Sequence, residues 1–437
     1  MDKRPVSYTA AELARLGRDN IPKELLSGSG LVYSSPATLA YNSPGAEGFG
    51  VKRAGLAVPE SVMLIVAPGC CGRNTSLISN MPGYKNRFFY LEMNEADLVT
   101  GNHLSRIPDA ILEVAEFVKP APKVVMICIT CVDALLGTDM ERVSRRAEEH
   151  LRAHGFDDTR VRPCYMYALT REGRRPPMVH VRQTLYSLLE PLDKDPKSVN
   201  IIGNFAPLMD GELMDYLTKA GVRHIRQIGS CRTYGEFLDM ARANFNIVTD
   251  PEARAAAEDM RTRLDIPYIE LTRVHGTDRI ALQYQAFANS IGIHIDDSLE
   301  RLDAEEKVRE LKSSYPNLTF NIGESCNADP FELATALVRY GFKVSEIYAA
   351  LAPEKFVYIR RLAELSPDTR IYCNMEPTML YYDISCSEAD ITIGKDAGYY
   401  CPDIPNIPWN SDRKPFGYQG VRDLMKSILE ALKEGQR

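Results

Sequence analysis

Cysteine residues occupy two turns of this sequence, each directly after a short apolar run. Cys70 and Cys71 follow the run at 61–67, and Cys131 follows the run at 123–130. Thiolates without a neighbouring histidine favour an iron–sulfur cluster or zinc. Because the carboxyl ends of parallel strands meet at one edge of a sheet, the two turns can converge on one metal site. The alternative for the vicinal pair is two buried thiols in a tight turn.

The residues beside these cysteines also suit a metal site. Gly69 and Gly72 give the backbone the freedom to bring sulfur atoms close to a ligand, and Arg73 would lower a thiol pKa and offset the charge of a cluster. Cys128 and Cys131 form a C-x-x-C pair, which resembles a thioredoxin-like redox motif. Here, however, Cys128 lies inside the strand, and a spacing of three sends the two side chains to opposite faces. We therefore expect Cys131 to be the ligand and Cys128 to lie in the core.

A parallel sheet is needed to position these turns, and the rest of the sequence predicts several such sheets. Apolar runs alternate with amphipathic helical patterns, the clearest helices being 107–118 and 140–153. The predicted strands are 61–67, 87–91, 123–130, 198–205, 224–228, 245–248, 268–271, 317–323, 343–348, 370–373 and 390–393. Three successive βαβ blocks indicate an α/β protein with three doubly wound, Rossmann-like parallel-sheet domains.

Polar, proline-containing stretches near 192–198 and 311–316 mark the borders between these blocks. The predicted organisation is an N-terminal helical extension at 1–30, an iron–sulfur-binding α/β domain at 31–195, a second α/β domain at 196–312, and a third at 313–437 with a C-terminal helix.

Composition excludes several classes of protein. The chain has 437 residues, 45% of them hydrophobic, and a formal net charge of −7, so a partner nucleic acid is not expected. It contains no apolar run of about 18 residues and no apolar leader, so neither a membrane span nor a secretory signal is predicted. We expect a reducing, cytoplasmic location, where cysteines serve as ligands or packed thiols rather than in disulfides.

Several motifs in a common order resemble the nitrogenase component 1 family. They lie between residues 35 and 430 and comprise the turn at 69–73 (GCCGR), the acidic stretch at 92–101 (EMNEADLVTG), the turn at 130–139 (TCVDALLGTD), the strand at 199–205 (VNIIGNF), the segment at 261–268 (RTRLDIPY) and the segment at 415–420 (PFGYQG). The vicinal cysteines are most similar to the nickel-sirohydrochlorin reductase type within this family.

The resemblance implies an iron–sulfur cluster buried between the first domains of two related subunits. Cys131 matches the third cysteine ligand of the family, and either Cys70 or Cys71 matches the second. The first ligand should lie about 26 residues before Cys71, where the sequence has no cysteine. We therefore expect a [4Fe-4S] cluster shared across a dimer rather than an eight-iron cluster.

The family's catalytic cofactor is held by a cysteine and a histidine, and the matching positions here are close to Ala257 and Ile407. Neither residue can ligate a metal, which implies a cavity open to a tetrapyrrole or another exchangeable substrate. Three residues that follow predicted strands are candidates to line it. His275 suits proton delivery, its alternative being a surface loop. Cys231 and Cys326 could contact a bound cofactor or substrate, or be packed thiols.

The chain has no G-x-x-x-x-G-K-[ST] phosphate loop, so no ATP site is expected on it. The resemblance implies a separate iron protein similar to nitrogenase reductase, which would dock near Arg73 and residues 140–146. The second subunit would be an identical chain or a paralogue, giving a homodimer, a heterodimer or a heterotetramer. The leading hypothesis is a nitrogenase-like reductase subunit. The alternatives are a metal-cluster assembly scaffold without turnover and a three-domain binding module without metal.

Overall fold

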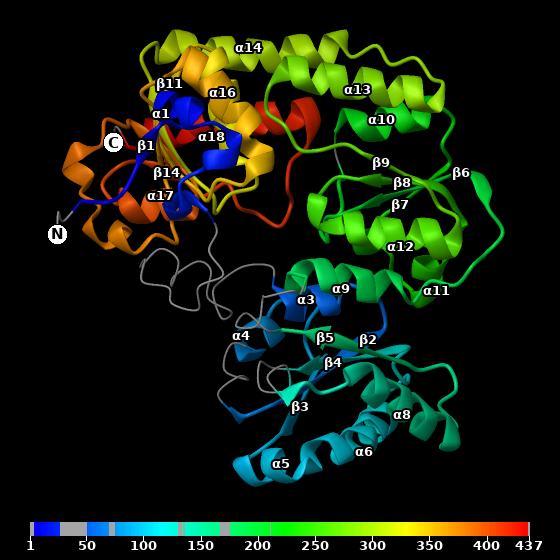
Figure 1. Ribbon diagram of the computed structural model, residues 1–437. Helices are drawn as coiled ribbons and strands as arrows, with labels where there is room; N and C mark the ends of the chain where they lie inside the picture. The colour runs from blue at the N-terminus through cyan, green and yellow to red at the C-terminus, as the bar shows by residue number, and fades with distance from the viewer. Residues whose placement is uncertain are drawn as a thin grey trace. The chain divides into compact units, whose positions relative to one another are not determined.

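The computed structural model describes residues 4–26, 50–69, 75–129, 133, 136–166, 175–209 and 211–435. The chain folds into two compact units, which we call unit BC and unit A (Figure 1). Unit BC consists of residues 47–207 and 222–270 and contains sheets B and C. Unit A consists of residues 1–46, 208–221 and 271–437 and contains sheet A.

Sheet B contains the two strands that precede the predicted cysteine turns in the sequence. Its strands are all parallel, in the order β3-β2-β4-β5. They are β2 (Ser61–Ala67), β3 (Phe88–Glu92), β4 (Val124–Ile129) and β5 (Arg160–Tyr165). The helices of unit BC are α3 (Val51–Gly55), α4 (Thr75–Ser79), α5 (Glu95–Thr100), α6 (Asn102–Phe117), α8 (Met140–Ala153), α9 (Pro177–Tyr186), α11 (Tyr234–Leu238) and α12 (Arg254–Leu264).

Both faces of sheet B are buried, each against its own pair of helices. On β2, Met63 and Ile65 belong to a core that includes residues of α3 and α9. Val62 and Leu64 belong to a second core, which includes residues of α6 and α8. Successive strand residues point to opposite faces, so a strand covered on both sides is apolar throughout, as the sequence of β2 is. The fold is therefore doubly wound, as predicted.

Sheet C has the strand order β7-β6-β8-β9 and is also parallel. Its strands are β6 (Asp195–Ile202), β7 (His224–Arg226), β8 (Ala243–Val248) and β9 (Tyr268–Glu270). Arg182 of α9 is buried and connects the two sheets of this unit. Its guanidinium donates to the carbonyl oxygen of Gly203 at 2.8 and 2.9 Å and pairs with Glu252 at 2.7 Å. This buried cation fixes α9 against the end of β6.

Sheet A has the order β1-β12-β11-β10-β13-β14. Its strands are β1 (Tyr8–Thr9), β10 (Thr319–Gly323), β11 (Lys343–Tyr348), β12 (Arg370–Tyr372), β13 (Ile391–Ile393) and β14 (Asn406–Ile407). All pairs are parallel except β1 with β12, where the N-terminal segment covers the sheet edge. The helices of unit A are α1 (Ala10–Leu16), α10 (Glu212–Lys219), α13 (Thr277–Ile291), α14 (Ser298–Ser314), α15 (Pro330–Arg339), α16 (Phe356–Leu365), α17 (Lys395–Tyr400) and α18 (Gly417–Gly435).

The C-terminal helix α18 begins against a buried carboxylate of α10. Glu212 accepts hydrogen bonds from the backbone N–H of Tyr418 at 2.5 Å and from the hydroxyl of Tyr284 at 2.9 Å. Gly417 has φ +63°, and a Cβ there would lie 2.0 Å from Glu212 Oε1. The Gly-Tyr pair of the C-terminal motif therefore anchors this helix, because only glycine leaves room for the carboxylate.

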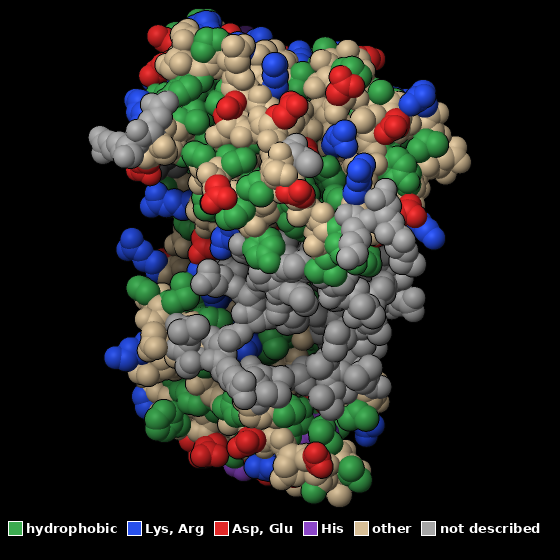
Figure 2. Space-filling model, turned by 90° about the vertical axis from the view of Figure 1, so that its left-hand side faces the viewer, with side chains coloured by type: hydrophobic (Ala, Val, Ile, Leu, Met, Phe, Trp, Pro, Cys, Tyr) green, Lys and Arg blue, Asp and Glu red, His purple; other side chains and the backbone are tan. Residues whose placement is uncertain are grey.

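The three sheets, parallel except for the pair of β1 with β12, confirm the predicted fold class. The predicted domain boundaries remain a prediction. Within the described residues, no helix is long and apolar enough to cross a membrane. Figure 2 shows one face of the protein, on which Lys and Arg side chains are interspersed with Asp and Glu side chains.

Candidate functional site

The carboxyl ends of β2 and β4 lie side by side in sheet B. Val66 pairs with Ile129 in parallel register, so the two strands end at the same edge. Neighbouring strands are about 4.8 Å apart. The predicted metal ligands and two of their neighbours lie outside the described residues: Cys70, Cys71, Gly72, Arg73 and Cys131. In the part of the chain that is described, no group of three His, Cys, Asp or Glu side chains could hold a metal ion.

Gly69 is the last described residue before the first cysteine turn. A Cβ at this position would lie 3.2 Å from Glu92 Oε1, at the end of the neighbouring strand β3. The hydroxyl of Tyr90, also on β3, donates to the carbonyl oxygen of Pro68. The backbone at Gly69 therefore passes close to β3, and a larger residue at this position would contact the Glu92 carboxylate.

A buried histidine that the sequence analysis did not single out contacts Asp133, which follows Cys131 by two residues in the sequence. His103 of α6 places Nδ1 3.1 Å from the carbonyl oxygen of Asp97 and Nε2 3.1 Å from Asp133 Oδ1. A carbonyl oxygen only accepts, so Nδ1 carries a proton, and the second contact needs another proton on either Nε2 or the carboxyl group. His103 thereby joins the acidic stretch at 92–101 to the segment after β4.

Three further polar groups lie close to this edge of sheet B. The Lys52 ammonium is buried and donates to Thr75 Oγ1 at 2.9 Å, immediately after the first cysteine turn. Cys128 and Cys164 pair across β4 and β5, and both are fully buried. A hydrogen bond to Cys128 and burial raise the pKa of the Cys164 thiol. The expectation that Cys128 belongs to the core is confirmed.

The remaining cysteine candidates are protonated thiols held by nearby carbonyl groups. In unit BC, Cys231 Sγ lies 3.3 Å from the carbonyl oxygen of Gln227, and burial raises its pKa to about 11. In unit A, Cys326 Sγ lies 3.3 Å from the carbonyl oxygen of Gly323, and burial raises its pKa well above the usual value. Without a metal, neither side chain supplies a thiolate near neutral pH.

His275 lies between β9 and α13 and is buried, not exposed on a surface loop, with 2% of its area accessible. Its backbone N–H donates to Glu332 Oε2 at 2.8 Å, and its Nδ1 lies 3.4 Å from the same oxygen. Its carbonyl oxygen accepts from the Tyr340 hydroxyl at 2.6 Å. The structure thus places this histidine beside a buried carboxylate. Its role in proton delivery stays a prediction.

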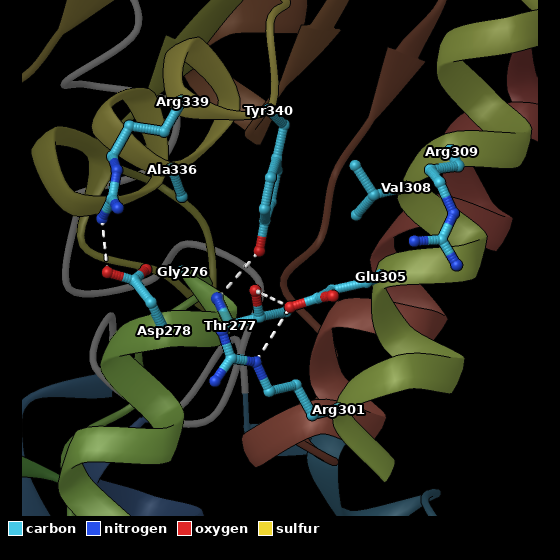
Figure 3. Close-up of a pocket in the computed structure, with 10 residues that line it drawn as sticks. All are labelled: Gly276, Thr277, Asp278, Arg301, Glu305, Val308, Arg309, Ala336, Arg339 and Tyr340. Carbon is cyan, nitrogen blue, oxygen red and sulfur yellow. Dashed lines mark hydrogen bonds and ion pairs between the residues drawn. The ribbon is translucent and has the colours of Figure 1, made fainter. Parts of the chain in front are cut away.

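A pocket of about 330 Å³ adjoins the segment that follows His275 (Figure 3). Arg339 pairs with Asp278 at 2.6 Å, and Arg301 pairs with Glu305 at 2.9 Å. The first amide of α13, at Thr277, donates to the Tyr340 hydroxyl at 3.0 Å. The polar groups at its base already bind one another, so this pocket is a salt-bridged junction of α13, α14 and α15.

Two carboxyl groups meet at the carboxyl edge of sheet A. Glu324 follows the central strand β10, and Asp396 follows the adjacent β13. Asn374 Nδ2 donates to Glu324 Oε1 at 3.0 Å and to Asp396 Oδ2 at 2.7 Å. Because the next strand in sequence, β11, lies on the other side of β10, this is a topological switch point, where α/β proteins bind ligands. Both carboxyl residues escaped the sequence analysis, although each closely follows an apolar run.

The solved structures that resemble this chain share its fold. Nitrogenase Cp1 at pH 6.5 aligns with a TM-score of 0.68 and 14% sequence identity, covering 96% of each chain. Nitrogenase Cp1 at pH 5 aligns with a TM-score of 0.63 and 15% identity, covering 95% of this chain and 91% of that one. These likenesses define the class of fold, an α/β architecture shared with nitrogenase Cp1.

The family model for nitrogenase component 1 type oxidoreductases matches residues 47–433, and the chain belongs to this family. Curated relatives include two proteins named nitrogenase iron-molybdenum cofactor biosynthesis protein NifE. The one from Sinorhizobium fredii is 24% identical over 84% of this chain and 76% of the relative. The one from Mesorhizobium japonicum is 25% identical over 90% of this chain and 82% of the relative.

Proposed function

We propose that the chain is a subunit of a nitrogenase-like reductase. It would hold a [4Fe-4S] cluster through Cys131 and either Cys70 or Cys71, at a contact with an identical or paralogous subunit. The observation that carries this proposal is the register of sheet B, in which Val66 of β2 pairs with Ile129 of β4. Both strands therefore end at one edge, the cysteines come next in the sequence, and thiolates are the donors that iron–sulfur clusters require.

The described residues around this edge suit such a group. The buried Lys52 ammonium lies beside Thr75, and a positive charge there would stabilise an anionic thiolate cluster. His103 holds the carboxyl group of Asp133, which follows Cys131 by two residues in the sequence. When bound, the cluster would accept and release single electrons. The chain's own residues would supply the thiolates, orient the two turns and keep water from the electron path.

The substrate of this reductase would be exchangeable and would bind in a cleft between the domains. Close to the two positions that match the family's cofactor ligands, the chain has Ala257 in α12 and Ile407 in β14, both buried and without a donor atom. A tetrapyrrole or a related unsaturated compound is the proposed substrate class. Electrons would come from an ATP-dependent iron protein similar to nitrogenase reductase, because the chain has no phosphate loop of its own.

A second candidate function is a scaffold on which a metal cluster is built and passed on without turnover. The names of the curated relatives favour it, since they are cofactor biosynthesis proteins. Both functions need the same cluster, so they differ in the step after electron delivery. Substrate reduction with the iron protein, ATP and dithionite would support the reductase, whereas cluster transfer to an acceptor protein without substrate reduction would support the scaffold.

The cluster itself is tested by a cysteine substitution. We expect the anaerobically purified chain, with its partner subunit, to contain about four iron and four sulfide per cluster and a reduced-state paramagnetic resonance signal. Cys131→Ala should abolish that signal and lower the iron content because a ligand is lost. Iron and sulfide analysis measures the cluster content of both proteins, and paramagnetic resonance spectra of the reduced proteins measure the signal.

The matched control is Cys164→Ala, which removes a buried thiol on the neighbouring strand. It should keep the iron, with a free energy of unfolding lowered by about 1 kcal/mol through the small cavity it leaves. An iron-free wild-type protein, or full retention of the signal in Cys131→Ala, would contradict the proposal.

A further inference from the structure

Glu324 holds a distinctive position in sheet A. It is the first residue after the central strand β10, at the edge where the chain order switches from β11 on one side to β13 on the other. Its Oε2 accepts from the backbone N–H of Ala350, after β11, at 3.1 Å, and its Oε1 accepts from Asn374, after β12, at 3.0 Å. Contacts from two neighbouring strands therefore hold this carboxyl group at the switch point.

The charged surroundings of Glu324 favour its protonated form. Burial and the neighbouring carboxylate of Asp396 raise the pKa of Glu324 to about 7. Asp396 is itself fixed by the backbone N–H groups of Glu324 at 2.8 Å and Ser325 at 3.0 Å. Two thiols, Cys326 and Cys373, also face Glu324, and burial keeps both protonated. The groups facing Glu324 thus include one carboxylate and two neutral thiols.

A second buried carboxyl group in the same sheet behaves differently. Glu346 of β11 accepts from the hydroxyls of Tyr348 and Tyr382, both at 2.6 Å, and from Tyr372 at 3.2 Å. Three phenol donors satisfy that carboxylate, as a structural group requires. Glu324 has one backbone donor and a shared side-chain amide, and it faces a like charge, so it is poised to exchange a proton instead.

The same edge carries an unusual backbone conformation. Trp409, two residues after β14, has φ +43°, an unusual value for a large aromatic residue. Its carbonyl oxygen accepts from the backbone N–H of Asn327 at 2.6 Å, close to Glu324 in sequence. In the described part of the chain, its buried indole Nε1 has no hydrogen-bond partner. Such outliers cluster at functional sites.

We infer that Glu324 is the proton donor to a substrate bound at the carboxyl edge of sheet A. The inference rests on the proposed reductase function. Reduction of a carbon–carbon double bond takes two electrons and two protons. The electrons arrive singly from the iron protein, and the two new bonds are C–H bonds. Glu324 gives one proton and recovers one from water, while the second proton comes from solvent.

The protonation of Glu324 is tested without turnover by infrared spectroscopy of the full chain. The carbonyl band of a protonated carboxylic acid should be present at pH 6 and lost with a midpoint near 7. Glu324→Gln should lack this band. Asp396→Asn should move the midpoint to lower pH, because a neighbouring negative charge is removed. Glu354→Gln, at an exposed residue of the same unit, should leave the band unchanged.

The role in catalysis is tested by single-turnover reduction of a water-soluble, metal-free tetrapyrrole, followed by its visible absorption. The wild-type rate should fall as pH rises through about 7, because the acid form of the donor is lost. Glu324→Gln should be about 100-fold slower with the pH dependence removed, and Glu324→Asp should recover part of the rate.

Failure of the proposed function and failure of the inference about Glu324 would give different results. If the wild-type chain shows the titrating band but never reduces the probe, the proposed function fails. If the probe is reduced and no band titrates near 7, or Glu324→Gln reduces it at the wild-type rate with cluster spectra unchanged, the inference about Glu324 is wrong.

Discussion

Buried polar side chains lie near the carboxyl edges of sheet B and of sheet A, the two regions proposed to be functional. His103 and Asp133 are each 1% exposed, and Asp133 follows Cys131 by two residues in the sequence. Asp133 also accepts from the Thr138 hydroxyl at 3.2 Å, while its other oxygen has no partner in the described part of the chain. Burying this carboxyl group is costly unless its donors stay in place. The position of the Asp133 side chain therefore depends on His103.

Removing the imidazole should destabilise the protein strongly. We expect His103→Leu to lower the free energy of unfolding by about 3–5 kcal/mol, because it leaves Asp133 buried without its main partner. Urea unfolding monitored by circular dichroism measures this change. His154→Leu, at an exposed histidine, should change it by no more than about 0.5 kcal/mol. Equal midpoints for the two variants would contradict the structural role of His103.

The sequence predicted the burial of a cysteine better than the meeting of two buried carboxyl groups. The burial of Cys128 followed from its place inside an apolar run, because strand position determines burial. Glu324 and Asp396 gave no such signal, since a single acidic residue after a strand is usually solvated. Their proximity arises from strand order in sheet A, which joins residues 72 positions apart. The strand order of the folded sheet is needed to see that Glu324 and Asp396 are neighbours.

Among the elements, the start of α18 shows how one helix depends on a distant carboxylate. The N–H groups of Tyr418 and Gln419 lie within hydrogen-bonding distance of Glu212 of α10, the second at 3.3 Å. A helix N-terminus carries a partial positive charge that a carboxylate stabilises. These two contacts span sequence separations of 206 and 207 residues, and they hold α10 to the C-terminal helix.

A side chain at the first residue of α18 should disrupt this contact. We expect Gly417→Ala to lower the free energy of unfolding by more than about 2 kcal/mol, through strain at a positive φ and displacement of Glu212. Gly292→Ala provides the control, because Gly292 has φ +72° and open space around its Cβ position. That variant should lose only about 1 kcal/mol. Thermal and urea unfolding of both proteins would separate the clash from the backbone strain.

Most strands were predictable because their two faces are both buried, which makes them continuously apolar. Strand β5, with the sequence RVRPCY, was missed because charged residues alternate with apolar ones and Pro163 interrupts the pattern. Strands β1 and β14 have two residues each, too few for any periodicity. These three strands lie at sheet edges, where one neighbour is absent and the demand for apolar side chains is weaker.

For the whole molecule, charge on α8 offers a test of the proposed partner. Arg142, Arg145 and Arg146 are exposed on this helix of unit BC. We expect the double substitution Arg145→Glu and Arg146→Glu to slow electron delivery from the iron protein about 10-fold at low salt, with a smaller effect at high salt. Stopped-flow reduction of the cluster measures this rate. Arg309→Glu, an exposed arginine of unit A, should leave the rate unchanged, and an equal loss in both proteins would argue against docking at α8.

The division of the chain into unit A and unit BC has a consequence for how the protein can be dissected. The polypeptide passes between the two units after residues 46, 207, 221 and 270. A single proteolytic cut in any one connection would leave both units joined by the others. Neither unit corresponds to one continuous gene fragment, so truncation at any one residue removes part of one unit or of both. Nicked protein should therefore stay associated and keep its cooperative melting until several connections are severed.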